Sequence, residues 1–161
     1  MNTASKAKQI VAALSPTEKA AKTARWAITM AKAFISIAGK DGVKWRLVEF
    51  GGVKGTESRG IVDVVAIRKN HKKREGYNNG DLFDIVLIQS KGGSAAPPTL
   101  EDKKRLKAVA RYHRAKAIVL VEWKRKEKLK FSRLEGMDWK QFEPAEIFGK
   151  ENTKNARTLS S

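Results

Sequence analysis

Three short runs of aliphatic and β-branched residues constrain the fold of this chain more than any other feature. They are IVDVVAI at 61–67, IVLI at 85–88 and AIVLVEW at 117–123. Each run is too short for a helix of ordinary length and is apolar on both faces, which is typical of a central strand in a covered sheet. Between the first two runs, the segment 77–81 contains Asn-Gly, which is a hairpin-type turn signal.

Two capping patterns predict the helices. Ser15, Pro16 and Glu18 form a capping box with proline at the first helical position, so we expect a helix from Pro16 to about Ala38, ended by Gly39. Thr99, followed by Asp102, starts a second helix that runs to about Arg114. Alternation of apolar and polar residues predicts further strands at 44–50 and 129–134.

The order of these elements is helix, strands with a hairpin, helix, strands. It predicts an α/β fold with a mixed central β-sheet flanked by helices. A chain of 161 residues suits a single domain, which we place at 16–148. We expect residues 1–15 to be an N-terminal extension, and residues 149–161, which are rich in Asn, Thr, Ser and Lys, to be a disordered tail.

The charge of the chain indicates its partner. Thirty-four Lys and Arg against 17 Asp and Glu give a net charge of +17. A field of this size attracts phosphate backbones, so we expect nucleic acid, with anionic membranes and acidic proteins as competing partners. The basic residues flank apolar segments rather than forming a tail, which indicates a folded basic surface; they cluster at 68–74, 103–116 and 124–130.

Several classes of protein are excluded by composition. The chain has no cysteine, which removes disulfide scaffolds, thiolate zinc sites and cysteine nucleophiles. No run reaches the roughly 18 apolar residues that a membrane span needs. We therefore expect a soluble, cytoplasmic protein that has no membrane partner.

Three polar residues stand where apolar ones are expected. Asp63 interrupts IVDVVAI, while Gln89 and Lys91 follow IVLI two residues apart, so that their side chains leave the same face of one strand. A carboxylate and an amide oxygen can hold a hard cation such as Mg²⁺, and a nearby ammonium can activate water or stabilise charge on a phosphate. A structural ion pair between Asp63 and Lys91 is the alternative explanation.

Asp63 in RGIVDVVA and the later Gln89-Ser90-Lys91 resemble the PD-(D/E)xK nuclease superfamily. The likeness is greatest to archaeal Holliday-junction resolvases and to Mrr-type restriction endonucleases, which commonly carry Gln before x-Lys, and it covers about residues 16–134. It implies a restriction-endonuclease-like fold and an endonuclease that uses Mg²⁺ or Mn²⁺. By this resemblance Asp63 and Gln89 are the metal-site residues and Lys91 is the catalytic lysine. Gln89 removes one negative charge from that site.

Two further carboxylates are candidates to supply the negative charge that Gln89 removes from the metal site. Glu18 lies on the first helix, where the resolvases carry a functional glutamate, although its role in the capping box explains it equally well. Glu57 lies in the glycine-rich segment that precedes Asp63. Ser58 and Arg59 beside it are candidate substrate contacts. A solvated loop carboxylate is the competing interpretation of Glu57.

The favoured function is hydrolysis of phosphodiester bonds in branched DNA such as a Holliday junction. No element for base reading is visible, and cleavage of a junction needs two active sites, so we expect a homodimer. Alternatives are a non-catalytic nucleic-acid-binding protein on the same fold, an endonuclease of restriction or repair type on duplex DNA, and an RNA-associated protein. The residues expected to track the backbone are Lys103, Lys104, Lys107, Arg111, Arg114, Lys124 and Lys126.

Overall fold

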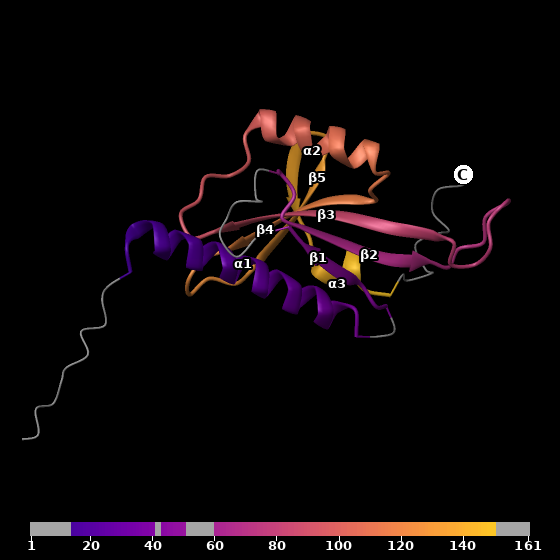
Figure 1. The fold of residues 1–161 in the computed structure, drawn as a ribbon, viewed down its shortest axis with the longest axis horizontal. Coiled ribbons are helices and arrows are strands. Elements are labelled where there is room, and N and C mark those ends of the chain that lie inside the picture. Colours follow the sequence, from indigo (N-terminus) through magenta and orange to yellow (C-terminus); the bar gives the residue numbers. More distant parts are fainter. Residues whose placement is uncertain (1–13, 41–42, 51–59, 151–161) are drawn as a thin grey trace, which may run out of the picture.

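A six-stranded mixed sheet with helices on both faces forms the molecule (Figure 1). The computed structural model describes residues 14–40, 43–50 and 60–150. The helices are α1 (Pro16–Ala38), α2 (Leu100–Tyr112) and α3 (Pro144–Phe148), and the strands are β1 (Arg46–Glu49), β2 (Val64–Asn70), β3 (Leu82–Gly92), β4 (Ala117–Trp123), β5 (Lys130–Glu135) and β6 (Asp138–Gln141). Within these ranges, no helix has the length and apolar character needed to cross a membrane.

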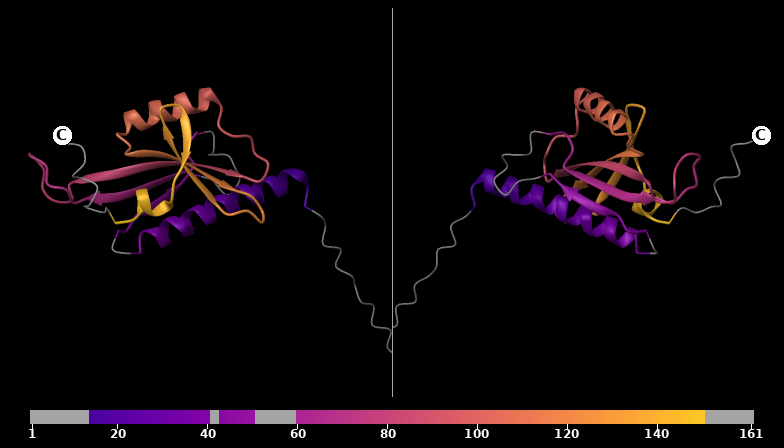
Figure 2. Two further views of the ribbon diagram at one scale, coloured as in Figure 1. Left: turned by 180° about the vertical axis from the view of Figure 1, so that it is seen from behind. Right: turned by 45° about the vertical axis from the view of Figure 1, so that its right-hand side comes forward.

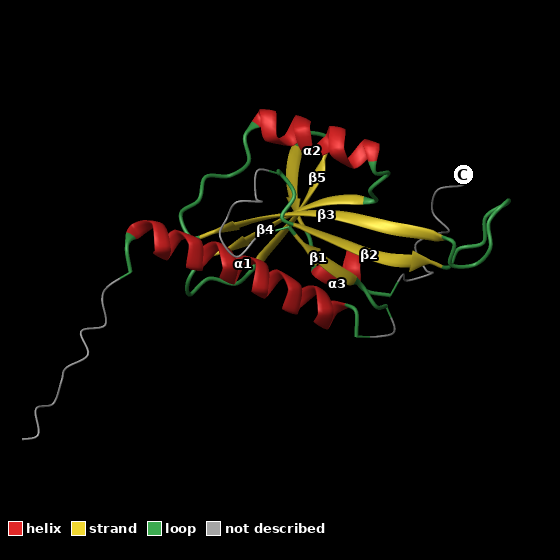
Figure 3. Cartoon of the chain, in the orientation of Figure 1, coloured by secondary structure: helices red, strands yellow, loops and turns green. Residues whose placement is uncertain are grey.

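The sheet follows the chain, with strands in the spatial order β1 to β6. Figure 3 shows the strands lying between α1 and α2. Every neighbouring pair is antiparallel except β3 and β4, which are parallel. A parallel pair needs a crossover rather than a tight turn, and α2 supplies it between the two strands. The predicted α/β class and the mixed sheet are confirmed.

Two apolar clusters lie on opposite faces of the sheet. On one face α1 and α3 cover the even-numbered residues of β2 and β3, including Val64, Ala66, Val86 and Ile88. On the other face α2 covers Leu87 and Ile118 through its buried residues Leu106 and Ala110. Figure 2 shows α1 and α2 on the two sides of the sheet. The strands that are apolar on both faces are therefore covered on both faces, as their sequences predict.

Both predicted capping boxes are present. The Glu18 amide donates to Ser15 Oγ at 3.2 Å, and the Ser15 amide donates to Glu18 Oε2 at 2.7 Å. The hydrogen bond from the Ser15 backbone lowers the pKa of Glu18 below its usual value. Thr99 and Asp102 form the same reciprocal pair at the start of α2. Helix α1 runs from Pro16 to Ala38, as predicted, and α2 ends at Tyr112, two residues earlier than expected.

The strand boundaries differ from the sequence prediction in ways that matter for the site. β2 begins at Val64, so Asp63 lies just before the strand and not within it. β3 extends well beyond the apolar run at 85–88 because its polar ends stay paired with β2 and β4. β1 is shorter than expected, and the sequence reading missed β6 and α3, which are short and weakly patterned.

Helix α1 is covered on one side only. Its buried residues are Ala27, Ala31 and Ile35, one helical turn apart, while Trp26 is 47% exposed and Ile37 is 57% exposed. The sequence predicts that a sheet covers one side of this helix and that either a partner subunit or a larger core of the same chain covers the other. The sheet is confirmed, and the partner subunit stays a prediction.

Helix α1 approaches β3 closely at Gly92, next to Lys91. A Cβ at Gly92 would lie 2.8 Å from the carbonyl oxygen of Thr23, so only glycine fits without a shift of the helix. We expect Gly92→Ala to lower the free energy of unfolding in urea by about 1–3 kcal/mol. Adding Thr23→Ala should not restore stability, because the obstacle is a backbone oxygen. Recovery in the double variant would contradict this packing.

Candidate active site

The predicted metal-site residues lie at one end of the β2–β3 pair. Val64 pairs with Ile88, so Asp63, one residue earlier, lies level with Gln89, one residue later. Asp63 remains bonded to both neighbouring segments: its amide donates to the Ile88 carbonyl at 2.9 Å, and its carbonyl accepts from the Phe50 amide at 2.9 Å. The backbone of Asp63 is therefore held in the sheet although β2 has not yet begun.

The carboxylate of Asp63 ends the ladder between β2 and β3. Its Oδ2 accepts the Ser90 amide at 2.6 Å and the Ser90 hydroxyl at 3.0 Å. A side-chain oxygen thus takes the position of the next backbone acceptor, which explains why the regular strand starts only at Val64. Among the described residues, Oδ1 of Asp63 accepts no hydrogen bond and stays available to another ligand.

Gln89 is a buried polar residue whose side-chain carbonyl oxygen lacks a hydrogen-bond donor among the described residues. It is 7% exposed, and its Oε1 has no hydrogen-bond partner among the described residues. Its neighbour Leu87 belongs to the cluster under α2, so Gln89 points to that face of the sheet. A buried carbonyl oxygen without a donor costs about 1–3 kcal/mol, and a cation can meet that cost.

Lys91 leaves the same face as Gln89 and is partly buried. Its charge lies close enough to α2 to contribute to lowering the pKa of Asp102, although the main cause is the hydrogen bond from the Thr99 backbone. The parallel register pairs Lys91 with Glu122 on β4, so that a second carboxylate follows on the neighbouring strand. In the described part of the chain Asp63 and Lys91 form no ion pair, so the alternative of a structural pair is not supported.

Sequence reasoning missed Asp102 and Glu122 as neighbours of Lys91. Glu122 stands at the end of the apolar run of β4, and the pairing of β4 parallel to β3 brings the ends of both strands to one edge. The signal that could have found it is the basic helix between the two runs, because a helical crossover implies parallel strands.

The donor set can be compared with what a cation requires. No group of three His, Asp or Glu residues that could hold a metal is found within residues 14–40, 43–50 and 60–150. Mg²⁺ commonly takes only one or two carboxylates and completes its shell with water and substrate phosphates. Asp63 Oδ1 and the unpaired Gln89 Oε1 are oxygen donors of the required type, so the residues fit a sparsely ligated Mg²⁺ or Mn²⁺.

The other predicted site residues divide into two groups. Glu57, Ser58 and Arg59 lie outside the described residues. Glu18 is exposed and its carboxylate accepts from the Ser15 amide, and no contact in the described chain joins it to Asp63 or Lys91. The capping interpretation of Glu18 is therefore confirmed, and a catalytic role stays a prediction.

The predicted DNA-contacting cations lie at two ends of the sheet. Lys124 and Lys126 follow β4 directly, and because the Gly93 amide donates to the Trp123 carbonyl at 2.8 Å, they lie near Lys91. Arg111 and Arg114 lie at the opposite end of α2, beside the start of β4. Lys104 is exposed on α2.

Two of the predicted cations are used within the fold. Lys103 Nζ donates to the Met137 carbonyl at 2.8 Å, and Lys107 Nζ donates to the Gly136 carbonyl at 3.1 Å. These bonds tie α2 to the turn between β5 and β6, a role that the sequence does not indicate.

The comparisons with protein-family models, with curated proteins and with solved structures found no match to this chain.

The orientation of Lys91 can be tested by titrating Asp102. We expect Lys91→Met to raise the pKa of Asp102 while leaving it below its usual value of 3.8, because the Thr99 backbone still donates. Carboxyl-detected NMR titration measures this change, and Lys104→Met is the matched control without effect. An unchanged Asp102 titration in Lys91→Met would contradict the placement of Lys91 under α2.

The same carboxyl predicts a pH dependence of stability. Since the pKa of folded Asp102 lies below its usual value, its cap stabilises α2 above that value and is lost as the pH falls through the lowered folded pKa. Thr99→Ala should weaken this acid dependence in thermal melts followed by circular dichroism.

Proposed function

We propose that the chain is a metal-dependent DNA endonuclease of the PD-(D/E)xK type. The observation that carries the proposal is the register of β2 and β3, which sets Asp63 level with Gln89 and leaves the buried Gln89 Oε1 without a partner among the described residues. A purely structural role would not explain why Gln89 Oε1 is buried without a hydrogen-bond donor among the described residues. It would also not explain why Asp63 Oδ1 accepts no hydrogen bond from them. Lys91, two residues along the same face, supplies the positive charge that phosphoryl chemistry needs.

The element order supports this proposal. Helix α1, the antiparallel strands β1 to β3, the crossover helix α2 and the parallel strand β4 follow the order expected of a restriction-endonuclease-like domain. The candidate residues lie where β3 and β4 both end, which is the edge where α/β sheets commonly place their sites.

The proposed reaction is hydrolysis of a phosphodiester bond. Asp63 Oδ1 and Gln89 Oε1 would hold Mg²⁺ or Mn²⁺, which supplies Lewis-acid activation of a phosphate oxygen and of water. Water gives a proton to bulk solvent and attacks phosphorus, the bond from phosphorus to the leaving oxygen breaks, and that oxygen takes a proton from solvent. Lys91 stabilises the negative charge on the phosphate oxygens during the attack. The hydrogen bonds from Ser90 keep the Asp63 carboxylate in place.

The substrate that we favour is branched DNA cut by a homodimer. The described basic residues predicted to contact DNA lie on or just after α2 and in the turn after β4, which suits contact with backbone rather than reading of base edges. The rival is a nucleic-acid-binding protein without catalysis, which the net charge of +17 supports without any need for a metal. The cleavage experiment below separates the two.

Removal of either key group should abolish cleavage. With Mg²⁺ or Mn²⁺ and a labelled four-way junction, we expect Asp63→Asn and Lys91→Met each to reduce the single-turnover rate by about 100-fold or more. The asparagine side chain retains an acceptor for the Ser90 amide, so the fold should be preserved. Lys40→Met, an exposed lysine just after α1 and outside the basic clusters, is the matched control and should cut at the parental rate.

Junction binding with no cleavage by the parent in either metal would establish the non-catalytic alternative. Parental rates in both Asp63→Asn and Lys91→Met would show that the site is wrongly assigned.

Gln89→Glu provides a gain-of-affinity test. A second carboxylate beside Asp63 adds a charged ligand, so the Mg²⁺ concentration for half-maximal binding should fall, as isothermal titration calorimetry would measure. Gln89→Leu, which has no oxygen, should raise that concentration. Equal Mg²⁺ affinity in both variants and the parent would contradict the assignment of Gln89.

A further inference from the structure

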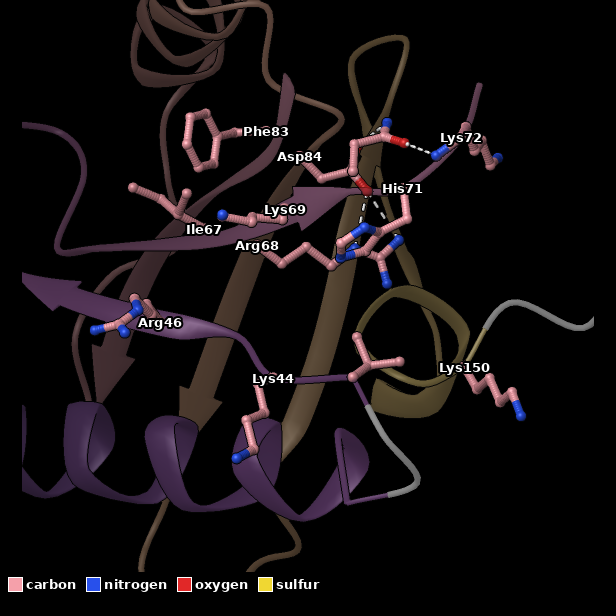
Figure 4. Close-up of a pocket in the computed structure, with 12 residues that line it drawn as sticks. Lys44, Arg46, Ile67, Arg68, Lys69, His71, Lys72, Phe83, Asp84 and Lys150 are labelled. Carbon is pink, nitrogen blue, oxygen red and sulfur yellow. Dashed lines mark hydrogen bonds and ion pairs between the residues drawn. The ribbon is translucent and has the colours of Figure 1, made fainter. Parts of the chain in front are cut away.

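A basic groove lies at the other end of the β2–β3 pair. β1 pairs with β2 only from Arg46 opposite Ile67 to Glu49 opposite Val64, so the segment before Arg46 separates from the end of β2. A cavity of about 720 Å³ opens there, as Figure 4 shows. Its cationic lining comes from β1, β2 and the segments next to β1, β2 and α3, and consists of Lys44, Arg46, Arg68, Lys69, Lys72 and Lys150.

Among the described residues that line the groove, the one carboxylate, Asp84, is already neutralised. Asp84 Oδ2 accepts from Arg68 Nε at 2.9 Å, and Asp84 Oδ1 accepts from the Asn70 amide group at 2.9 Å. The side chains of Arg68 and Asp84 are each 12% exposed, and Arg68 also lies over the Trp45 ring at 4.8 Å from its centroid. The buried pair adds no net charge, and Lys44, Arg46, Lys69 and Lys150 give the groove a positively charged lining.

An exposed aromatic ring stands in the middle of the basic surface. Phe83 is 57% exposed and pairs across the strands with Lys69. It lines the groove and also a second hollow of about 380 Å³, which continues past Arg74 to Arg114 and Lys116. Figure 4 shows Phe83, Ile67 and Lys69 together on one side of the groove. On the face of the sheet that carries Phe83, Lys69 pairs with it directly and Arg46 pairs with Ile67 on the same side. These residues form a track of cations beside an exposed aromatic ring.

We propose that this track binds a single-stranded segment of nucleic acid, with phosphates on the lysines and arginines and a base stacked on Phe83. Stacking needs a base whose face is free, which a duplex does not present. The cations alone would suit any polyanion, and the exposed ring selects a single strand. Lys69 of the 68–74 cluster thereby gains a role that the active-site proposal does not give it.

The groove is separate from the candidate active site. Asp63 precedes β2 and Lys69 lies near its end, so the two are about 20 Å apart along the strand. The inference rests on the proposed function only in taking nucleic acid as the ligand. For a nuclease, it implies a substrate with a single-stranded arm beside the cleaved segment.

Fluorescence anisotropy in EDTA tests the proposal without cleavage. The probes are fluorescein-labelled dT20 and a 20-base-pair duplex. We expect Phe83→Ala to weaken dT20 binding by about 5- to 150-fold, as loss of one stacked base does, and to change duplex binding less than twofold. Phe83→Trp should bind dT20 at least as tightly as the parent, which separates stacking from damage to the fold.

The salt dependence of dT20 binding tests the charged part of the track. Lys44→Gln with Lys69→Gln should lower the slope of log affinity for dT20 against log salt by about 1.4, which is about 0.7 for each lost phosphate contact. Lys140→Gln, on β6 at the opposite edge of the sheet, is the matched control and should keep the parental slope. Circular dichroism confirms that each variant is folded.

Parental dT20 affinity in Phe83→Ala, or equal losses for dT20 and duplex, would overturn the inference. The failure of the nuclease proposal is distinguishable, because the parent would then bind dT20 through the groove and cut no substrate in Mg²⁺ or Mn²⁺.

Discussion

The parallel pairing of β3 with β4 is the constraint on which the rest of the structure depends. It requires a crossover, which α2 provides, and it places the ends of both strands at one edge of the sheet. Gln89 and Lys91 on β3 therefore share that edge with Glu122 on β4. An antiparallel pairing would have sent the end of β4 to the far side of the molecule, and with it the basic turn after Trp123.

The β2–β3 pair carries different chemistry at its two ends because the sheet changes differently at each. At one end the Asp63 carboxylate takes the place of a backbone acceptor through its Oδ2. Its Oδ1 and the buried Gln89 Oε1 have no hydrogen-bond donor among the described residues. At the other end β1 departs from β2, and a basic groove opens. Between these ends the strands are apolar and rigidly covered, so the two proposed sites are held at a fixed separation, which suits an elongated polyanion.

Much of this arrangement could be predicted from the sequence. The rest could not, because it depends on contacts between residues that are far apart in the chain. Both capping boxes and the run of β4 are local patterns, and the structure has them where they were expected. The predicted start of β2 was wrong because the Asp63 carboxylate accepts a hydrogen bond from the amide of Ser90, a residue far away in the chain. Glu122 and the groove depend on strand pairing, which no single segment encodes, and Lys103 was assigned to DNA although its ammonium holds the Met137 carbonyl.

The central claim is that Asp63 and Gln89 together hold a divalent cation. Anomalous scattering from crystals grown with Mn²⁺ tests it most directly, because the metal is located without reference to any activity. The account predicts Mn²⁺ within bonding distance of Asp63 Oδ1 and Gln89 Oε1, and its loss in crystals of Asp63→Asn. Mn²⁺ bound elsewhere, with Gln89 Oε1 accepting a hydrogen bond from the protein, would contradict it.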